Sequence, residues 1–261
     1  MYNFEFEKPS TVADAVAALA GDEAQALGGG QTLIPTMKQR LASPSKLVSL
    51  SGIAEMQGVQ REGASLTIGG AVSHADVAAQ ATDYPALAEM AGHIGDPAVR
   101  NRGTIGGSLA NNDPSADYPA AALASAATVV TNAREIAADD YFQGMFDTAL
   151  KDGEIITGVK FSVPQAANYQ KFVQPASRFA LVGVFVAKHA DGVRVAVTGA
   201  SEEGVFRWSE AEAALDADFS ADAISGLTLD PSGMIGDLHG TKEYRAHLVG
   251  VMTKRAVAAA D

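Results

Sequence analysis

Two glycine-rich stretches hold the residue types of this sequence that are suited to chemistry. Residues 27–35 read LGGGQTLIP, and residues 103–119 read GTIGGSLANNDPSADYP. Glycine has no Cβ, so its backbone can come close to a ligand and present its N–H groups to it. A stretch that also carries asparagine, aspartate and proline packs poorly in a core. The second stretch therefore predicts contact between the main chain and a ligand.

The first stretch follows a predicted strand and opens a predicted helix. In that position free N–H groups and the helix dipole attract an anion, and Thr32 adds a hydroxyl. Leu33 stands where a dinucleotide-binding fingerprint needs its third glycine, and no GK[ST] follows as in a Walker A loop. Taken alone, the stretch is also consistent with a plain tight turn.

The second stretch combines glycines with hydroxyl groups. Gly103, Gly106 and Gly107 surround Thr104 and Ser108. We interpret this as a glycine turn that can wrap an extended polar ligand with N–H and O–H groups together. Two such loops in separate units predict a ligand held at its middle from two sides, and a dinucleotide with a central diphosphate fits that description.

Two aspartates close the second stretch. Asp113 precedes Pro114, the pattern of a helix N-cap followed by proline at the first helical position. Asp117 lies just beyond the loop. We therefore expect Asp113 to cap a helix and Asp117 to accept a hydrogen bond from a ligand hydroxyl.

The elements around these stretches form three predicted units, and the predicted fold class is α+β. Residues 1–55 alternate strand and helix as β-α-β-α-β, which indicates a small α/β lobe. Residues 56–165 mix alternating strands with helices in a larger α+β lobe. Residues 166–261 carry a hairpin over residues 179–201 and a long final helix, which indicates an antiparallel sheet covered by helices.

The boundary before the third unit rests on a polar segment. Residues 164–170 read PQAANYQ, the most linker-like composition in the chain. Beyond it, alternation on both arms of the hairpin predicts a turn at residues 190–192, where Ala, Asp and Gly stand together.

Composition excludes several classes of function. The chain has 261 residues, no cysteine and a net charge of −12. Without cysteine it cannot ligate an iron–sulfur cluster or form a disulfide. The acidic balance argues against nucleic acid as a partner, because such binding needs Lys and Arg. No apolar run approaches the ~20 residues of a membrane span, so we expect a cytoplasmic protein.

Side-chain catalysis and metal binding are not predicted. The five histidines are scattered without HExxH or other ligand spacing, so we interpret them as core or surface residues. GGSLA is not GxSxG, so Ser108 is not predicted to be a nucleophile. The sequence predicts neither a catalytic residue nor a metal site.

The two stretches carry a family resemblance. GGGQTLIPTMKQR and VRNRGTIGGSLANNDPSADYPAA resemble the two flavin-binding motifs of the FAD subunit of molybdenum hydroxylases. That subunit is the medium subunit of the carbon monoxide dehydrogenase and xanthine dehydrogenase family. EIITGVKFSVP, YQKFVQPASRFALVGV and GTKEYRAHLVGVMTKRAV extend the resemblance over nearly the whole chain. It implies a two-lobed PCMH-type FAD-binding domain followed by a small C-terminal α+β domain with an antiparallel sheet.

The resemblance also implies a cofactor and its site. The cofactor is FAD. Residues 28–32 and 104–108 would hold its diphosphate through backbone N–H and hydroxyl groups. Asp117 would lie near the adenosine and ribityl portion, with Ile94 and Ile156 as apolar neighbours of the flavin. The complete set of expected binding residues is Gly28, Gly29, Gly30, Gln31, Thr32, Leu33, Ile94, Thr104, Gly106, Gly107, Ser108, Asn111, Asp117 and Ile156.

The implied activity is electron transfer within a complex. The FAD subunit of this family takes electrons from two [2Fe–2S] clusters on a small subunit, which receives them from a molybdenum-cofactor large subunit. It passes them to NAD⁺, oxygen, a quinone or another acceptor. The absence of cysteine places the clusters on a partner, and the resemblance implies a dimer of heterotrimers. The alternatives are a self-sufficient FAD-dependent oxidoreductase of the same fold and a non-catalytic adaptor without flavin.

Overall fold

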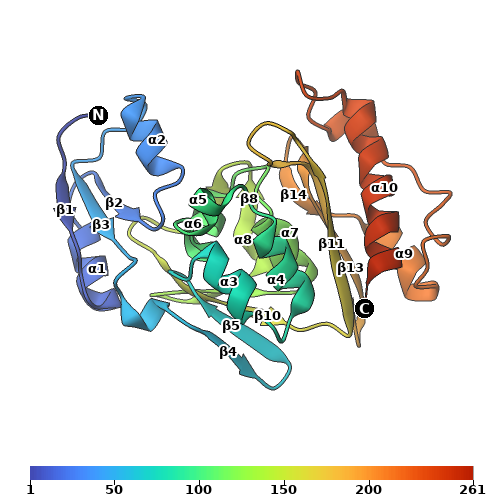
Figure 1. Cartoon of the computed structure of the whole chain (residues 1–261), viewed down its shortest axis with the longest axis horizontal. Coiled ribbons are helices and arrows are strands. Elements are labelled where there is room, and N and C mark those ends of the chain that lie inside the picture. Colours follow the sequence, from blue (N-terminus) through green and yellow to red (C-terminus); the bar gives the residue numbers. More distant parts are fainter. Residues whose placement is uncertain (261) are drawn as a thin grey trace.

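Three sheets follow one another along the longest axis of the molecule (Figure 1). The computed structural model describes residues 1–260. The sheets have three, five and four strands, and a short two-stranded ribbon accompanies the second. The mixture of helices with antiparallel sheets confirms the predicted α+β class. Within residues 1–260, no helix combines the length and the apolar character that a membrane crossing requires.

The N-terminal unit is a parallel three-stranded sheet with the order β1-β3-β2. Its elements are β1 (Glu5–Glu7), α1 (Val12–Leu19), β2 (Ala24–Leu27), α2 (Leu33–Lys38) and β3 (Lys46–Ser49). The predicted β-α-β-α-β order is confirmed. The N-cap hydroxyl of Thr11 accepts a hydrogen bond from Asp14 N at 3.1 Å and starts α1. The first glycine loop lies between the end of β2 and the start of α2.

The middle unit is built on an antiparallel sheet with the order β4-β5-β10-β6-β7. Its strands are β4 (Val59–Glu62), β5 (Ser65–Gly69), β6 (Thr128–Thr131), β7 (Glu135–Ala137) and β10 (Ile156–Ser162), and the ribbon is β8 (Phe142–Gly144) with β9 (Asp147–Thr148). Its helices are η1 (Ala54–Met56), α3 (His74–Gln80), α4 (Pro85–Gly92), α5 (Pro97–Arg100), α6 (Ile105–Asn111), α7 (Tyr118–Ala124) and α8 (Ala138–Tyr141). The central strand β10 comes from the far end of this segment of the chain, so long-range pairing closes the unit.

The C-terminal unit is an antiparallel sheet with the order β11-β12-β13-β14, and α10 covers its outer face (Figure 1). Its elements are β11 (Ala166–Val173), β12 (Ala180–His189), β13 (Gly192–Ser201), β14 (Gly204–Arg207), α9 (Ser209–Ala217), η2 (Pro231–Gly233) and α10 (Lys242–Ala259). Gly192 still pairs with His189, so the predicted hairpin turns at residues 190–191 alone.

The linker prediction for residues 164–170 is wrong. From Ala166 onward the chain forms the edge strand β11, which pairs with β12 along its length. Ala167 and Tyr169 are buried in the core of the middle unit. Their contacts lie far away in sequence, so the polar composition of the segment alone did not reveal them.

Helix α7 joins the middle and C-terminal units. Every residue of α7 is buried, and the helix packs against the inner face of β12 and β13. One hydrophobic cluster accordingly contains Leu123 of α7, Phe161 of β10 and Phe185 of β12. Each sheet lies within one of the three predicted units. The boundaries at residues 55 and 165 stay predictions, because this shared core crosses the second of them.

Enlarging a side chain in α7 tests the packing between these units. Ala121 is fully buried, so we expect Ala121→Leu to overpack the core and lower the free energy of unfolding by about 1–3 kcal/mol. Ala79→Leu, on the exposed face of α3, is the matched control and should change it by less than about 0.5 kcal/mol. Chemical denaturation measures both. Equal effects of the two substitutions would contradict the buried position of α7.

Candidate cofactor-binding site

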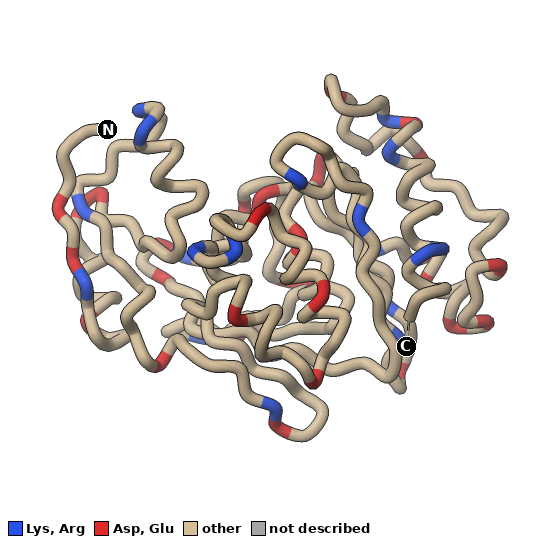
Figure 2. Tube along the Cα trace, viewed as in Figure 1, with Lys and Arg blue, Asp and Glu red and all other residues tan. Residues whose placement is uncertain are grey.

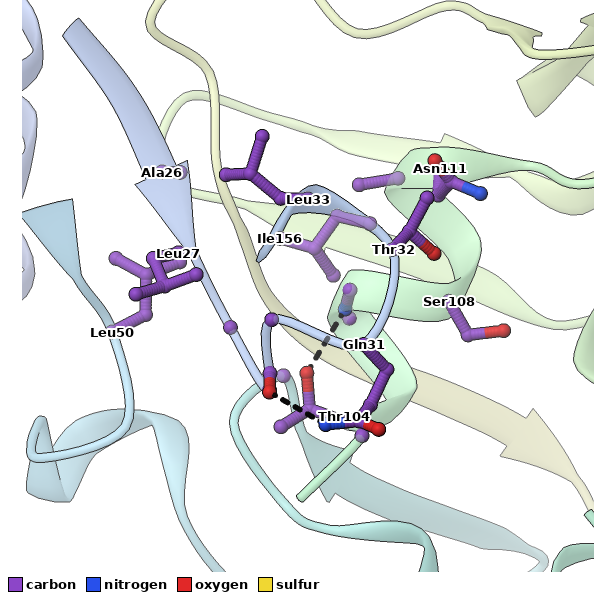
Figure 3. Close-up of a pocket in the computed structure, with 18 of the residues that line it drawn as sticks. Ala26, Leu27, Gln31, Thr32, Leu33, Leu50, Thr104, Ser108, Asn111 and Ile156 are labelled. Carbon is purple, nitrogen blue, oxygen red and sulfur yellow. Dashed lines mark hydrogen bonds between the residues drawn. The ribbon is translucent and has the colours of Figure 1, made fainter. Parts of the chain in front are cut away.

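A cleft of about 430 Å³ lies between the N-terminal and middle units. Its walls come from the loop after β2, the start of α6 and the beginning of β10 (Figure 3). The following expected site residues line it: Gly28, Gly29, Gly30, Gln31, Thr32, Leu33, Thr104, Gly106, Gly107, Ser108, Asn111 and Ile156. The two glycine stretches, nearly 70 residues apart in sequence, therefore meet in one cavity of the size that small-molecule sites have.

The two stretches touch through their backbones. A Cβ on Gly29 would lie 1.9 Å from the carbonyl oxygen of Arg102 and 2.5 Å from Cα of Gly103. A Cβ on Gly28 would lie 2.8 Å from Oγ1 of Thr104. Glycine is therefore required at this junction for the close approach of the two units, independently of any ligand.

The first loop presents free hydrogen-bond donors. Within residues 1–260, no acceptor receives a hydrogen bond from the backbone N–H groups of residues 28–33. Thr32 occupies the N-cap position of α2 but its side chain makes no capping bond. Gly30 has a φ of +71°, which turns the chain between β2 and α2. A run of unpaired N–H groups at the start of a helix is a site for an anion.

The second stretch is a helix rather than a glycine turn. Thr104 is the N-cap of α6 and accepts a hydrogen bond from Gly107 N at 3.1 Å (Figure 3). The N–H of Ile105 donates to Val72 O at 3.1 Å, and that of Gly106 donates to Gly70 O at 2.9 Å. The N–H groups of residues 105–108 are thus all used inside the protein, since that of Ser108 donates to Thr104 O at 2.9 Å. The expectation that this stretch helps to hold a diphosphate stays a prediction, which would rest on the N–H of Thr104 and on hydroxyl groups.

What α6 offers to the cleft is space and side chains. A Cβ on Gly107 would meet only Oγ1 of Thr104, at 3.0 Å, so the ligand side of this residue is open. Ser108 and Asn111 of α6 line the cleft, and Asn111 is drawn beside Thr32 in Figure 3. This wall therefore supplies a hydroxyl and a carboxamide.

Apolar side chains line another part of the cleft. Leu27 at the end of β2 and Leu50 just after β3 lie together. Leu33 and Ile156 lie apart from this pair, nearer to α6 (Figure 3). Ile156 is 4% exposed. The arrangement suits a ligand with an anionic middle and flat, apolar ends.

Ile94 and Asp117 are not among the residues that line the cleft. The Asp117 carboxylate is buried, pairs with Lys171 Nζ at 3.0 Å and accepts a hydrogen bond from Tyr169 Oη at 2.6 Å. Burial raises the pKa of Asp117, and the Lys171 ammonium opposes that rise. In this structure Asp117 ties the start of α7 to β11, and its carboxylate is already satisfied.

The remaining predicted cap also differs. No helix starts after Asp113, whose carboxylate instead accepts a hydrogen bond from Ser115 N at 2.8 Å in a turn. Asp113 itself lines the cleft. A proline after an aspartate fits a turn as well as a helix start, and the local sequence does not separate the two.

Among the residues that line the cleft and that the sequence did not single out are two with titratable side chains, His74 and Glu154. Glu154 accepts a hydrogen bond from Arg134 Nε at 3.0 Å, and its side chain is 4% exposed. The Arg134 guanidinium and further donors lower the pKa of Glu154 to about 2. The partner lies 20 residues away, so no local motif marks this pair. Within residues 1–260, no three His, Asp or Glu side chains are grouped closely enough to hold a metal ion.

The Glu154 pair predicts a pH dependence of stability. The folded pKa of about 2 lies below the ordinary value of 4.5, so the stabilisation is complete above pH 4.5 and is lost as the pH falls toward 2. We expect Glu154→Gln to lower the free energy of unfolding by on the order of 1 kcal/mol at pH 7, since Arg134 is partly solvated. The difference should shrink toward zero near pH 2. Thermal unfolding of both proteins across this range measures it, and a pH-independent difference would contradict the ion pair.

Known proteins match this chain over most of its length. Residues 2–166 match the family described as the FAD binding domain in molybdopterin dehydrogenase. The chain is 33% identical to the carbon monoxide dehydrogenase medium chain of Afipia carboxidovorans, over 98% of this chain and 96% of that protein. It is 34% identical to the nicotine 6-hydroxylase medium subunit of Paenarthrobacter nicotinovorans, over 97% and 95%. Its fold is similar to that of a chain of reconstituted CO dehydrogenase from Oligotropha carboxidovorans, with a TM-score of 0.88, 30% identity and coverage of 98% and 97%.

Proposed function

The chain belongs to the family of FAD-binding domains of molybdopterin dehydrogenases, and we propose that it transfers electrons within a molybdenum hydroxylase complex. The predicted resemblance is confirmed, as are the two-lobed FAD-binding fold, FAD as cofactor and the assignment to oxidoreductase subunits. The source of the electrons, their acceptor and the assembly are the parts that we propose.

The residues of the cleft fit FAD. The free N–H groups of residues 28–33 suit a diphosphate, the open face of Gly107 leaves it room, and the apolar walls suit ring systems. Among the residues that the structure describes, no lysine or arginine lines the cleft. Basic residues are scattered over the whole trace instead of gathered in one patch (Figure 2). The proposal depends above all on the free N–H groups of residues 28–33, because they could bind the negatively charged diphosphate where no cationic side chain lines the cleft.

Each wall would have a distinct part in holding the cofactor. Residues 28–33 would bind the diphosphate, Ser108 and Asn111 would bind its hydroxyl-bearing neighbours, and Leu33 with Ile156 would exclude water. Bound FAD supplies the redox chemistry, since it exchanges electrons singly or in pairs. The protein contributes binding and orientation, and no side chain of the cleft is assigned a catalytic role.

The assembly follows from the cysteine-free sequence and the relatives. The chain has no cysteine to ligate a cluster, and relatives carry the names medium chain and medium subunit. We infer that a small subunit with [2Fe–2S] clusters and a large subunit with the molybdenum cofactor complete the complex, in a cytoplasmic dimer of heterotrimers. Electrons would leave through FAD to an external acceptor.

Replacing Gly107 tests the cleft as the flavin site. A valine side chain there would occupy ligand space while meeting little protein. We expect Gly107→Val to weaken FAD binding by at least about tenfold. The free energy of unfolding of the apoprotein should change by less than about 1 kcal/mol, since valine is not a poorer helix former than glycine. Quenching of flavin fluorescence and chemical denaturation measure the two quantities.

Gly52→Val is the matched control, because a Cβ at Gly52 meets no atom within 4 Å and Gly52 lies outside the cleft. It should bind FAD like the wild type. Full flavin stoichiometry and unchanged affinity in Gly107→Val would show that the cofactor binds elsewhere.

Partner dependence of flavin reduction tests electron transfer. The chain is produced alone with FAD and, separately, purified from its source with the proteins bound to it. We expect substrate of the whole complex to bleach the flavin absorbance only in the second sample, since electrons must pass through partner clusters. Reduction of the isolated holoprotein by a small organic substrate would instead support the self-sufficient oxidoreductase.

A further inference from the structure

His74 lies in the cleft wall without an assigned role. It is the first residue of α3, after the N-cap Ser73, whose hydroxyl accepts a hydrogen bond from Asp76 N at 3.1 Å. His74 is one of the residues that line the cleft, although it is only 5% exposed. Within residues 1–260, Nδ1 is buried and has no hydrogen-bond partner. Buried N–H groups in native proteins are nearly always paired, so this nitrogen is better left with its lone pair than with the ring proton.

The ring of His74 lies directly behind the junction of the two glycine stretches. Its backbone N–H donates to Gly103 O at 2.9 Å. A Cβ on Gly103 would lie 2.5 Å from Nε2 of His74, so glycine at position 103 makes room for the ring nitrogen. Gly103 in turn faces Gly29 of the first loop. Gly103 is thus in contact with the His74 ring and with Gly29, so the imidazole lies close to the loop that carries the free N–H groups of residues 28–33.

Packing fixes the ring in this position. The ring centroids of His74 and Tyr118 are 5.3 Å apart. Tyr118 is fully buried and its hydroxyl likewise has no partner in the described part of the chain. In the described part of the chain, no acceptor lies within hydrogen-bond distance of Nδ1. Since a buried N–H without an acceptor is costlier than an unfilled lone pair, the proton belongs on Nε2.

The imidazole is a neutral donor at physiological pH. Burial, and to a lesser degree the nearby Arg100 guanidinium, lower the pKa of His74 to about 4. A neutral imidazole has one N–H and one acceptor nitrogen. Nε2–H therefore offers a dipole of the same kind as the backbone N–H groups beside it, without adding a charge.

We propose that His74 is a cofactor-binding residue whose Nε2–H donates a hydrogen bond to the diphosphate of FAD. The inference rests on the proposed function, since it concerns the ligand of that cleft. It adds a side-chain donor to a site otherwise made of main-chain N–H groups. It also gives a role to Nε2, the ring nitrogen that Gly103 leaves room for.

Three variants of the full-length chain separate hydrogen bonding from packing. His74→Gln places an amide N–H near the Nε2 position, His74→Asn places it near Nδ1, and His74→Phe keeps the ring without nitrogen. We expect His74→Gln to bind FAD about as tightly as the wild type. His74→Asn and His74→Phe should bind it roughly threefold to tenfold more weakly, which corresponds to the loss of one hydrogen bond. Flavin fluorescence measures binding, and thermal unfolding of each apoprotein reports its folding.

Imidazole ¹H–¹⁵N NMR on the wild type measures the tautomer of His74 and the chemical shift of its N–H group. Ligand binding should not change this shift if His74 only packs against its neighbours. We expect the Nε2–H tautomer at pH 7 and a shift of its resonance on addition of FAD or of ADP, which shares the diphosphate. Riboflavin, which lacks it, should leave the resonance unchanged. An Nδ1–H tautomer, an unmoved resonance, or equal FAD affinity of wild type, Asn and Phe would overturn the inference while leaving the flavin site intact. Failure of the wild type itself to bind FAD would overturn the proposed function with it.

Discussion

The backbone contact between residues 28–29 and residues 102–103 is the constraint on which the rest of the site depends. A side chain at Gly29 would overlap the Arg102 carbonyl, at a distance of 1.9 Å. Further backbone segments are packed equally closely beneath this contact. A Cβ on Gly106 would lie 2.5 Å from Gly70 O, and a Cβ on Gly70 would lie 2.1 Å from Ile156 O. Glycines therefore let α6, β5, β10 and the first loop converge. Separating them would pull the free N–H groups away from α6 and open the cleft.

The C-terminal unit supports the same wall from behind. The hydroxyl of Thr198 donates to Ala116 O at 2.7 Å or to Pro114 O at 3.0 Å, and Gly199 N donates to Pro114 O at 2.8 Å. Ala116 lines the cleft, and Asp117, next in sequence, pairs with Lys171 of β11. The turn after α6 is thus fixed by β13 and β11 together. The third unit shapes a site that its own residues do not line.

Local chemistry in the sequence predicted the elements and the cleft, whereas long-range pairing decided the details. Glycine, hydroxyl and strand-to-helix patterns in the two stretches are local, and they marked residues that line one cavity. The donors of Ile105 and Gly106 were misassigned because their acceptors, Val72 and Gly70, belong to another part of the chain. Asp117 was expected at a ligand because it lies just beyond the loop. Its ion-pair partner Lys171 lies 54 residues away, so the local sequence did not reveal the pair. His74 carried no motif, since its importance comes from Gly103 beside it.

Neutral donors explain how an acidic chain can hold a diphosphate. A lysine or arginine in this cleft would lose hydration on burial, and without the ligand its charge would need a partner. N–H dipoles of the loop carry no net charge, so they cost far less to keep partly buried in the apoprotein. They are already oriented by the turn at Gly30 and by the contact of Gly29 with Arg102. The backbone contact that brings the two units together thus also orients the N–H groups that would bind the diphosphate. This arrangement does not depend on the net charge of −12.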